Sequence, residues 1–138
     1  SPYPPILDMN TINGPIEISG AGGTVTLTPF QVNHGSIDAL GFRIGDLAYL
    51  PDVASIPEDV WADHLQELDV WILDALRRDP HPTHAHLAKS LQWMDRARPR
   101  QGVLTNMHVD LDYATVEAET PDHITPAYDG MVITQPLG

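Results

Sequence analysis

The sequence of 138 residues contains no cysteine. This absence excludes disulfide bonds and thiolate ligands, so a bound metal would be held by nitrogen and oxygen donors alone. No apolar run approaches the ~20 residues that span a bilayer, and the amino-terminal segment SPYPPILDMN has neither the basic nor the apolar region of a signal peptide. We therefore expect a cytoplasmic protein that makes no contact with a membrane.

Basic residues are scarce in this chain. Seven Lys and Arg residues stand against 19 Asp and Glu residues, which gives a formal net charge of -12. Binding along a phosphate backbone requires clustered basic side chains, so we expect no long nucleic acid as a partner. An acidic surface also repels anionic substrates unless a bound cation reverses the local field. A phosphate ester substrate would therefore favour a metal site.

Alternation of apolar and polar residues predicts most of the strands. It indicates two strands joined by a glycine turn within residues 14–35, and a hairpin within residues 38–53 that turns at Gly45 and Asp46. Continuous apolar runs predict buried strands within residues 69–76 and 102–108. Further strands are expected through Ile124 and over residues 131–133.

Helical spacing of apolar residues predicts three helices, over residues 57–68, 83–97 and 113–119. Ser55 is the expected cap of the first helix, and Pro99 ends the second. With 42% hydrophobic residues, a chain of this length buries roughly two-thirds of its unfolded surface, which suffices for one modest core. The order of elements predicts one sheet with helices on one face.

Polar residues stand at the ends of the expected strands. They are His34 in QVNHG, Asp52 in AYLPDV, His84 in HPTHAH and His108 in TNMHVDLD. Imidazoles and carboxylates brought together by the ends of successive strands are typical of a metal site, because strand ends are rigid and their loops converge. The competing interpretation of His34 is a turn histidine bonded to the backbone. For His84 it is a solvent-facing residue at the start of a helix.

Four segments carry a resemblance to a known family: GFRIGDLAYLPDV, LDVWILDALRRDPHPTHAHL, TNMHVDLDY and AYDGMVI. Together they resemble the C-terminal half of a metallo-β-lactamase-fold hydrolase, in the branch similar to the phosphoribosyl cyclic phosphodiesterase of phosphonate breakdown. The resemblance implies an α/β fold, half of an αββα sandwich with a mixed sheet and helices on one face. Residues 1–138 would then be a single partial domain. The HxHxDH motif of the family's N-terminal half is absent.

The resemblance also implies roles for individual residues. His34 matches a histidine metal ligand, and Asp52 matches the carboxylate that bridges two divalent metal ions, zinc or manganese. A shared carboxylate suits two cations because it lowers their mutual repulsion. His84 matches the histidine that faces the scissile phosphate and protonates the leaving group, and His81 lies near enough in the sequence to orient it.

The last ligand departs from the commoner pattern of the family, in which histidine directly follows the threonine. Here Thr105 is followed by Asn106, and the histidine comes at His108. His108 takes over the ligand role if the chain stays extended, because residues 106 and 108 of a strand share a face. Otherwise Asn106 contributes a weak oxygen ligand, which shifts the preference from zinc toward manganese or magnesium.

Two carboxylates are candidates for supporting roles behind the ligands. Asp74 follows the buried run VWIL and is expected either to orient a ligand histidine or to cap the end of a strand. Asp112 in DLD is expected at the start of a helix, where it could also support the site.

The function implied by the resemblance is that of a metal-dependent hydrolase. It would act on small cyclic or nucleotide-like phosphodiesters through a hydroxide that bridges two metal ions. One alternative keeps the fold and changes the substrate to a carboxylic ester, thioester or lactone. Another is a non-catalytic fragment that needs a complementary N-terminal chain. The missing N-terminal half is thus an expected partner, and a homodimer is left open.

Overall fold

The computed structural model describes residues 2–136. Its sheet consists of β1 (Ile16–Gly20), β2 (Gly23–His34), β3 (Ile37–Ile44), β4 (Leu47–Leu50), β5 (Val70–Asp74), β6 (Gln101–Thr105) and β7 (Ile124–Pro126). The helices are α1 (Glu58–His64), α2 (Leu87–Ala97) and α3 (Tyr113–Glu119). This α/β arrangement confirms the fold class that the sequence predicts.

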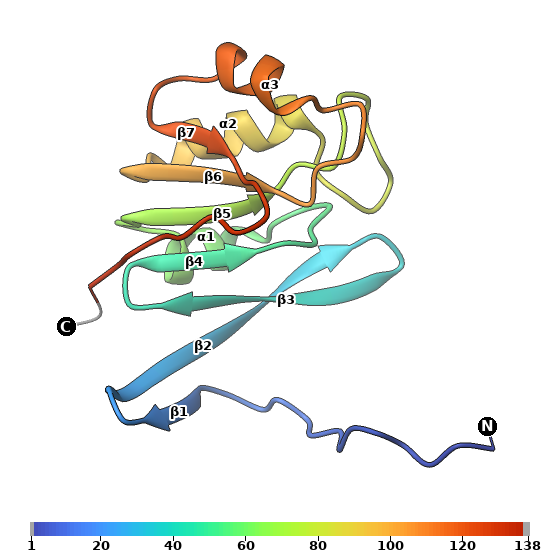
Figure 1. Cartoon of the computed structure of the whole chain (residues 1–138), viewed down its shortest axis with the longest axis vertical. Helices are drawn as coiled ribbons and strands as arrows, with labels where there is room; N and C mark the ends of the chain where they lie inside the picture. Colours follow the sequence, from blue (N-terminus) through green and yellow to red (C-terminus); the bar gives the residue numbers. More distant parts are fainter. Residues whose placement is uncertain (1, 137–138) are drawn as a thin grey trace.

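The strands lie in the sheet in the same order as in the sequence (Figure 1). Neighbouring strands from β1 to β4 are antiparallel, because short turns connect them, and Gly45 adopts a positive φ of 58° in the turn before β4. From β4 to β7 the neighbours are parallel, because helices connect them. The sheet is therefore mixed, as expected.

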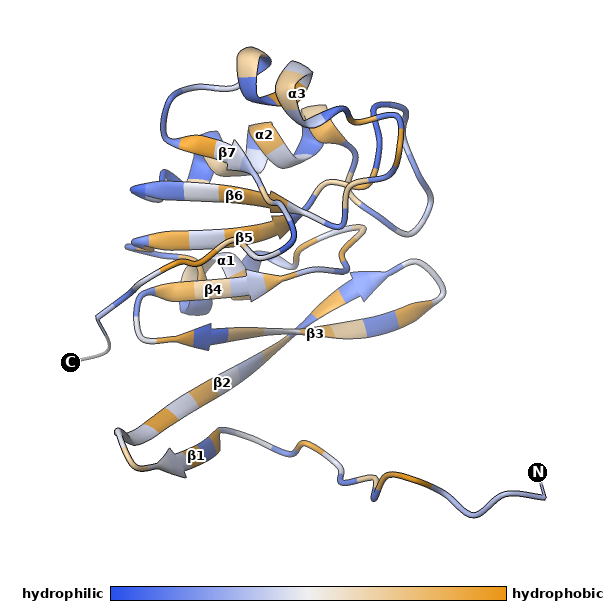
Figure 2. Cartoon of the chain, viewed as in Figure 1, coloured by the Kyte–Doolittle hydropathy of each residue, from blue (hydrophilic) through white to orange (hydrophobic). Residues whose placement is uncertain are grey.

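The core lies between the sheet and its helices. Apolar residues alternate or run together along β4, β5 and β6, and the helices α1 and α2 lie behind these strands (Figure 2). Trp61 of α1 packs edge-on against Trp71 of β5, and Met94 of α2 is fully buried. The segment after β7 runs back along the sheet (Figure 1). Near the carboxyl end of β6, Ala127 N–H donates a hydrogen bond to Leu104 O, and residues near position 135 lie at the opposite edge of the sheet.

Three sequence expectations differ from the structure. The helix α2 begins at Leu87 rather than at residue 83. The carbonyl of Thr83 accepts a hydrogen bond from His34 Nδ1 and that of Ala85 accepts from Leu76 N–H, so neither carbonyl is free for a helical bond. Ser55 does not cap α1, since it pairs with Asn33 in an isolated bridge. The expected strand over residues 131–133 is absent from the described chain, where the segment turns at Gly130 and makes no ladder.

One edge of the sheet gathers the strand ends that matter for function. The strands β2 and β4 are each antiparallel to β3 and so run in one direction, and β5 and β6 are parallel to β4. The carboxyl ends of these four strands therefore lie along the same edge. This is the edge at which ligands bind in α/β sheets.

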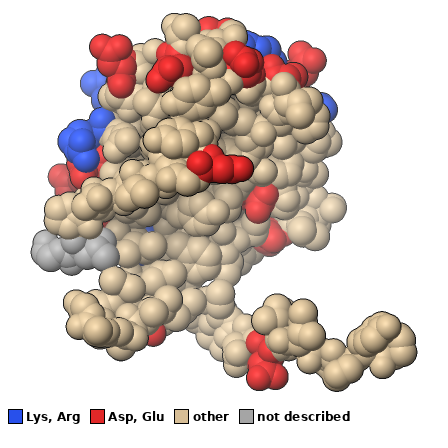
Figure 3. Space-filling view, in the orientation of Figure 1, with Lys and Arg blue, Asp and Glu red and all other residues tan. Residues whose placement is uncertain are grey.

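The surface is predominantly acidic. Acidic side chains are spread over the face shown in Figure 3, and the basic ones lie at its upper left and upper right margins. Several basic side chains are paired, as in the two-bond contacts of Arg78 with Glu119 and of Arg96 with Glu58. Within residues 2–136, no helix combines the length and the apolar character that a bilayer crossing requires.

Gly41 tests the packing of the central strands. A Cβ atom at this position would lie 2.5 Å from Phe30 Cε2 and 2.9 Å from Leu50 Cδ1, both in the core. We expect Gly41→Ala to lower the free energy of unfolding by about 1–3 kcal/mol, because neighbouring side chains must leave their preferred positions. Gly20→Ala is the matched control, since a Cβ there meets nothing within 4 Å. Urea unfolding followed by circular dichroism measures both, and equal effects would contradict the packing argument.

Candidate metal centre

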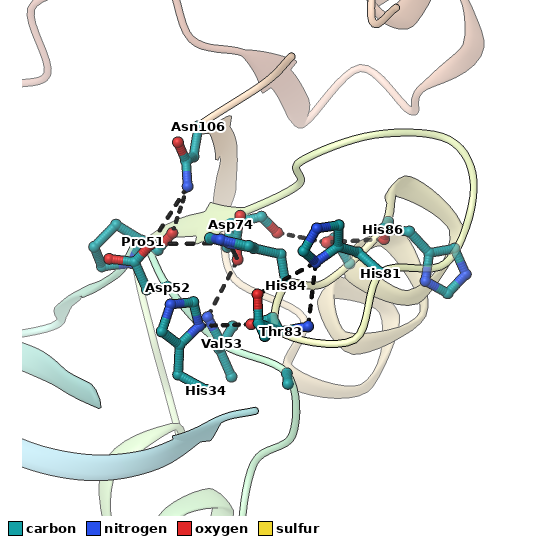
Figure 4. A network of polar contacts seen from close by, with 12 residues as sticks. His34, Pro51, Asp52, Val53, Asp74, His81, Thr83, His84, His86 and Asn106 are labelled. Carbon is teal, nitrogen blue, oxygen red and sulfur yellow. Dashed lines mark hydrogen bonds and ion pairs between the residues drawn. The ribbon is translucent and has the colours of Figure 1, made fainter. Parts of the chain in front are cut away.

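Three of the predicted site residues meet at the shared edge of the sheet. One donor atom each from His34, Asp52 and His84 lies within 4.8 Å of the other two. The side chains come from the end of β2, the loop after β4 and the loop before α2, and Figure 4 shows them facing one another. Each is partly exposed, so a small ligand can reach the cluster. The sequence separated these residues by as many as 50 positions, and the sheet brings them together.

A backbone carbonyl fixes the orientation of His34. Its Nδ1 donates a hydrogen bond to the carbonyl oxygen of Thr83 at 2.5 Å. Because a carbonyl accepts only, Nδ1 carries the proton, and Nε2 of the neutral ring keeps a lone pair for a ligand. Gly35 permits this approach, since a Cβ at that position would lie 2.4 Å from Thr83 Cγ2.

The loop that carries Asp52 is held at several points. Val53 N–H donates to Asp74 Oδ2 at 3.1 Å, and Ala54 N–H donates to Asn33 O at 2.7 Å. Lys89, the only lysine of the sequence, donates from Nζ to Ala54 O at 2.6 Å. The Asp52 carboxylate itself is 47% exposed, so its backbone is fixed while its oxygens stay available.

Asp74 orients His84. The carboxylate is fully buried at the end of β5, and its Oδ2 accepts from His84 Nδ1 at 2.8 Å. Burial raises the pKa of Asp74, and the hydrogen bonds from His84 and Val53 act in the opposite direction. Since the donor to Asp74 is Nδ1, the free position of the His84 ring is Nε2. The structure thus selects, of the two expected roles for Asp74, the orientation of a histidine.

His81 lies beside His84, with ring centroids 5.3 Å apart. Its Nδ1 accepts a hydrogen bond from Thr83 N–H at 3.1 Å, so the proton of the neutral ring is on Nε2. Partial burial lowers the pKa of His81, and the positive charge of Arg77 acts in the same direction. At neutral pH this histidine is therefore predominantly uncharged.

Asn106 and His108 take different positions. Asn106 adopts a positive φ of 62°, directly after β6 ends, and so breaks the extended chain that the His108 hypothesis required. Asn106 Nδ2 donates to Pro51 O at 3.2 Å and lies 3.4 Å from Asp52 Oδ1 (Figure 4). His108 is 63% exposed, lies near Asp110, and is not part of the cluster. Of the two candidates, the structure places Asn106 at the centre.

Asp112 serves the helix that follows it. Its carboxylate accepts from the N–H of Thr115 at 3.0 Å, which caps α3. The hydrogen bonds from Thr115 hold the pKa of Asp112 below its usual value. The structure therefore gives Asp112 the helix-start role and provides no contact between it and the cluster among the described residues.

The donor set fits a divalent cation. His34 has a lone pair free on Nε2 and the Asp52 carboxylate is accessible, whereas Asn106 turns its amide nitrogen, and not its oxygen, toward Asp52. The sequence analysis missed two supports of this site, the carbonyl of Thr83 and the ammonium of Lys89. The sequence does contain a signal for Lys89, because it is the only lysine in an acidic chain. It contains no signal for the Thr83 carbonyl, because every residue has a carbonyl group.

Comparisons with known proteins agree with this description. The sequence model of the beta-lactamase superfamily domain matches residues 3–107. A solved diphosphatase of the PhnP family is 32% identical, with a TM-score of 0.84 over 92% of this chain and 48% of its own. The human tRNase Z short form, at 20% identity, shares the fold with a TM-score of 0.64 over 81% of this chain and 42% of that one.

A curated octanoyltransferase of Porphyromonas gingivalis is 26% identical over 136 residues, which are 95% of this chain and 27% of that protein. The chain thus spans about half the length of the matched diphosphatase and about a quarter of the octanoyltransferase. The metallo-β-lactamase-fold protein YhfI of Bacillus subtilis also aligns, with a TM-score of 0.68 at 14% identity. The matched family domain, the mixed sheet and the His/Asp cluster at its edge show that this chain belongs to the beta-lactamase superfamily, with the metallo-β-lactamase fold.

Proposed function

We propose that this protein takes part in the metal-dependent hydrolysis of small phosphodiesters, cyclic or nucleotide-like. The observation that carries the proposal is the meeting of His34, Asp52 and His84 within 4.8 Å at the carboxyl edge of the sheet. The likeness to a diphosphatase at 32% identity supports phosphorus rather than carbon as the centre that is attacked. The net charge of -12 supports a cation at the site, because an anionic substrate would otherwise be repelled.

Some side chains of the site would bind metal, and another would transfer a proton. His34 and Asp52 would hold divalent metal ions, zinc or manganese, and Asn106 would add an oxygen donor only if its amide turned over, since Nδ2 faces Asp52 in this structure. When bound, such an ion withdraws charge from a phosphoryl oxygen and makes water more acidic. Asp52 would be the carboxylate shared by two ions, and its fixed loop would keep it in place.

His84 would supply the proton to the leaving group. Its Nδ1 is engaged by Asp74, so Nε2 is the atom that can protonate a departing alkoxide. The Asp74 carboxylate holds the ring in one orientation. His81 would assist by its position beside this ring.

The N-terminal half of the same fold is the proposed partner of this segment, on another part of the same protein or on a separate chain. It would supply the histidines of an HxHxDH motif and so complete the ligand set. The 48% of the diphosphatase chain that this segment covers supports this proposal.

A second candidate function is hydrolysis of a carboxylic ester or thioester. The match to an octanoyltransferase over 136 residues favours it, since that name indicates chemistry on an acyl group. Assays of the protein with its complementary half should therefore compare a cyclic nucleotide and bis(nitrophenyl) phosphate with a nitrophenyl ester and an octanoyl thioester. Turnover of the phosphodiesters in manganese or zinc, abolished by chelation, supports the first proposal. Turnover of the acyl substrates alone would replace it with the second.

One prediction from the proposed function concerns metal content. His34→Ala and Asp52→Ala are each expected to reduce the metal bound per chain, from about two ions in a complete site, because each removes a ligand. Plasma mass spectrometry after desalting measures the content. His123→Ala is the matched control, because His123 is exposed and lies outside the cluster. Unchanged metal content in the two site variants would contradict the ligand assignment.

A further prediction tests whether His84 is the proton donor or a metal ligand, since its ring lies in the same cluster as His34 and Asp52. His84→Ala is expected to lower kcat by about 10²- to 10⁴-fold, the usual contribution of a general acid, with the metal content unchanged. The loss should be smaller for a substrate whose leaving group is a weak base, such as nitrophenolate, because that group needs no proton. A fall in metal content in this variant would instead identify His84 as a ligand.

A further inference from the structure

We infer that Arg77 is a positioning residue, whose guanidinium holds the loop over residues 77–86 in the conformation that presents His81 and His84 to the metal centre. The inference rests on the proposed function for its catalytic consequence. Its structural part stands on the contacts of Arg77 alone.

The loop carries three groups of the site. His81 and His84 lie on it, and the carbonyl of Thr83 accepts the hydrogen bond that orients His34. The loop belongs to neither β5 nor α2, and its tip at Asp79 and Pro80 is exposed. The return of the loop is held by the buried Ala85, whose carbonyl accepts from Leu76 N–H, whereas no packing fixes the tip. Ordering such an exposed tip costs conformational entropy.

The guanidinium of Arg77 binds the tip of the loop, and the backbone carbonyl of Arg77 binds its far end. Its Nε donates to the carbonyl of Asp79 at 3.1 Å, and its Nη2 donates to the carbonyl of Pro80 at 2.7 Å. Its own carbonyl accepts from Leu87 N–H at 2.9 Å, at the first residue of α2. Arg77 thus connects the tip of the loop to the start of α2. The two carbonyls that accept from its guanidinium belong to the residues directly before His81.

The chemistry of the guanidinium explains why arginine suits this position. Its nitrogens lie in one plane at fixed angles, so it can donate to two carbonyls at once with little loss of side-chain freedom. A lysine ammonium is a single point on a flexible stem and cannot reproduce both bonds in that geometry. Arg77 itself is half-buried, while both of its bonds to the loop lie at the exposed surface.

The neighbouring Arg78 provides the matched control. It carries the same charge, but its guanidinium makes two bonds to Glu119 of α3 and none to the loop tip among the described contacts. Removal of either arginine changes the net charge equally. A difference between the two variants therefore reports the contacts rather than the charge.

The experiment compares Arg77→Gln, Arg77→Lys and Arg78→Gln in the protein without added metal. Amide hydrogen exchange is measured by NMR, above all at Thr83, whose N–H donates to His81 Nδ1. Arg77→Gln should accelerate exchange at Thr83 and its neighbours at least about tenfold, because the loop opens locally more often. Arg77→Lys should have an intermediate effect, and Arg78→Gln should leave this exchange unchanged. No acceleration in Arg77→Gln, or equal acceleration in Arg78→Gln, would overturn the inference.

Kinetics of the metal-loaded protein give the second readout. Arg77→Gln should lower kcat by up to about 10²-fold with little change in KM, as expected when a catalytic group is misplaced. A raised KM with unchanged kcat and unchanged exchange would show that Arg77 binds the substrate directly, and would overturn the positioning role. If the unmodified protein has no activity on any phosphodiester when assayed with its complementary half, the proposed function fails, while the exchange experiment still decides the role of Arg77.

Discussion

One buried carboxylate oxygen joins the two loops that carry the candidate site. Asp74 Oδ2 accepts hydrogen bonds from Val53 N–H, next to Asp52, and from Nδ1 of His84. A buried carboxylate without such partners is costly, and these two donors offset part of that cost. The position of a candidate metal ligand and that of a candidate proton donor therefore depend on the same atom, although 32 residues of sequence separate Asp52 from His84.

The sheet provides the rigid frame for this arrangement. The strands β2, β4, β5 and β6 run in one direction and end at one edge, so that the side chains just beyond them converge. The chemistry lies in loops, and the loops are tied to the frame by backbone contacts such as that between Asn33 and Ala54. Rigid strands and anchored loops together give the pre-organisation that a metal site needs.

Several features of the fold and the site could be predicted locally. The hairpins, the buried strands and the strand-end positions of His34 and Asp52 followed from periodicity and turn residues, because each depends on neighbours in the sequence. The start of α2 could not be predicted, since hydrogen bonds to distant partners hold residues 83–86 out of the helix. The turn at Asn106 is a further case, because its positive φ separates it from His108.

The sequence by itself determined the donor chemistry: without cysteine, a cation would be held by nitrogen and oxygen donors, and the acidic composition favours a cation. It also determined the family, through segments whose residues keep the family's order. Only the tertiary structure decided which donors meet, which nitrogen of each imidazole is free, and that Asn106 rather than His108 stands beside Asp52. The physical reason is that hydrogen bonds between residues far apart in the chain fix these positions, and a sequence pattern contains no record of them.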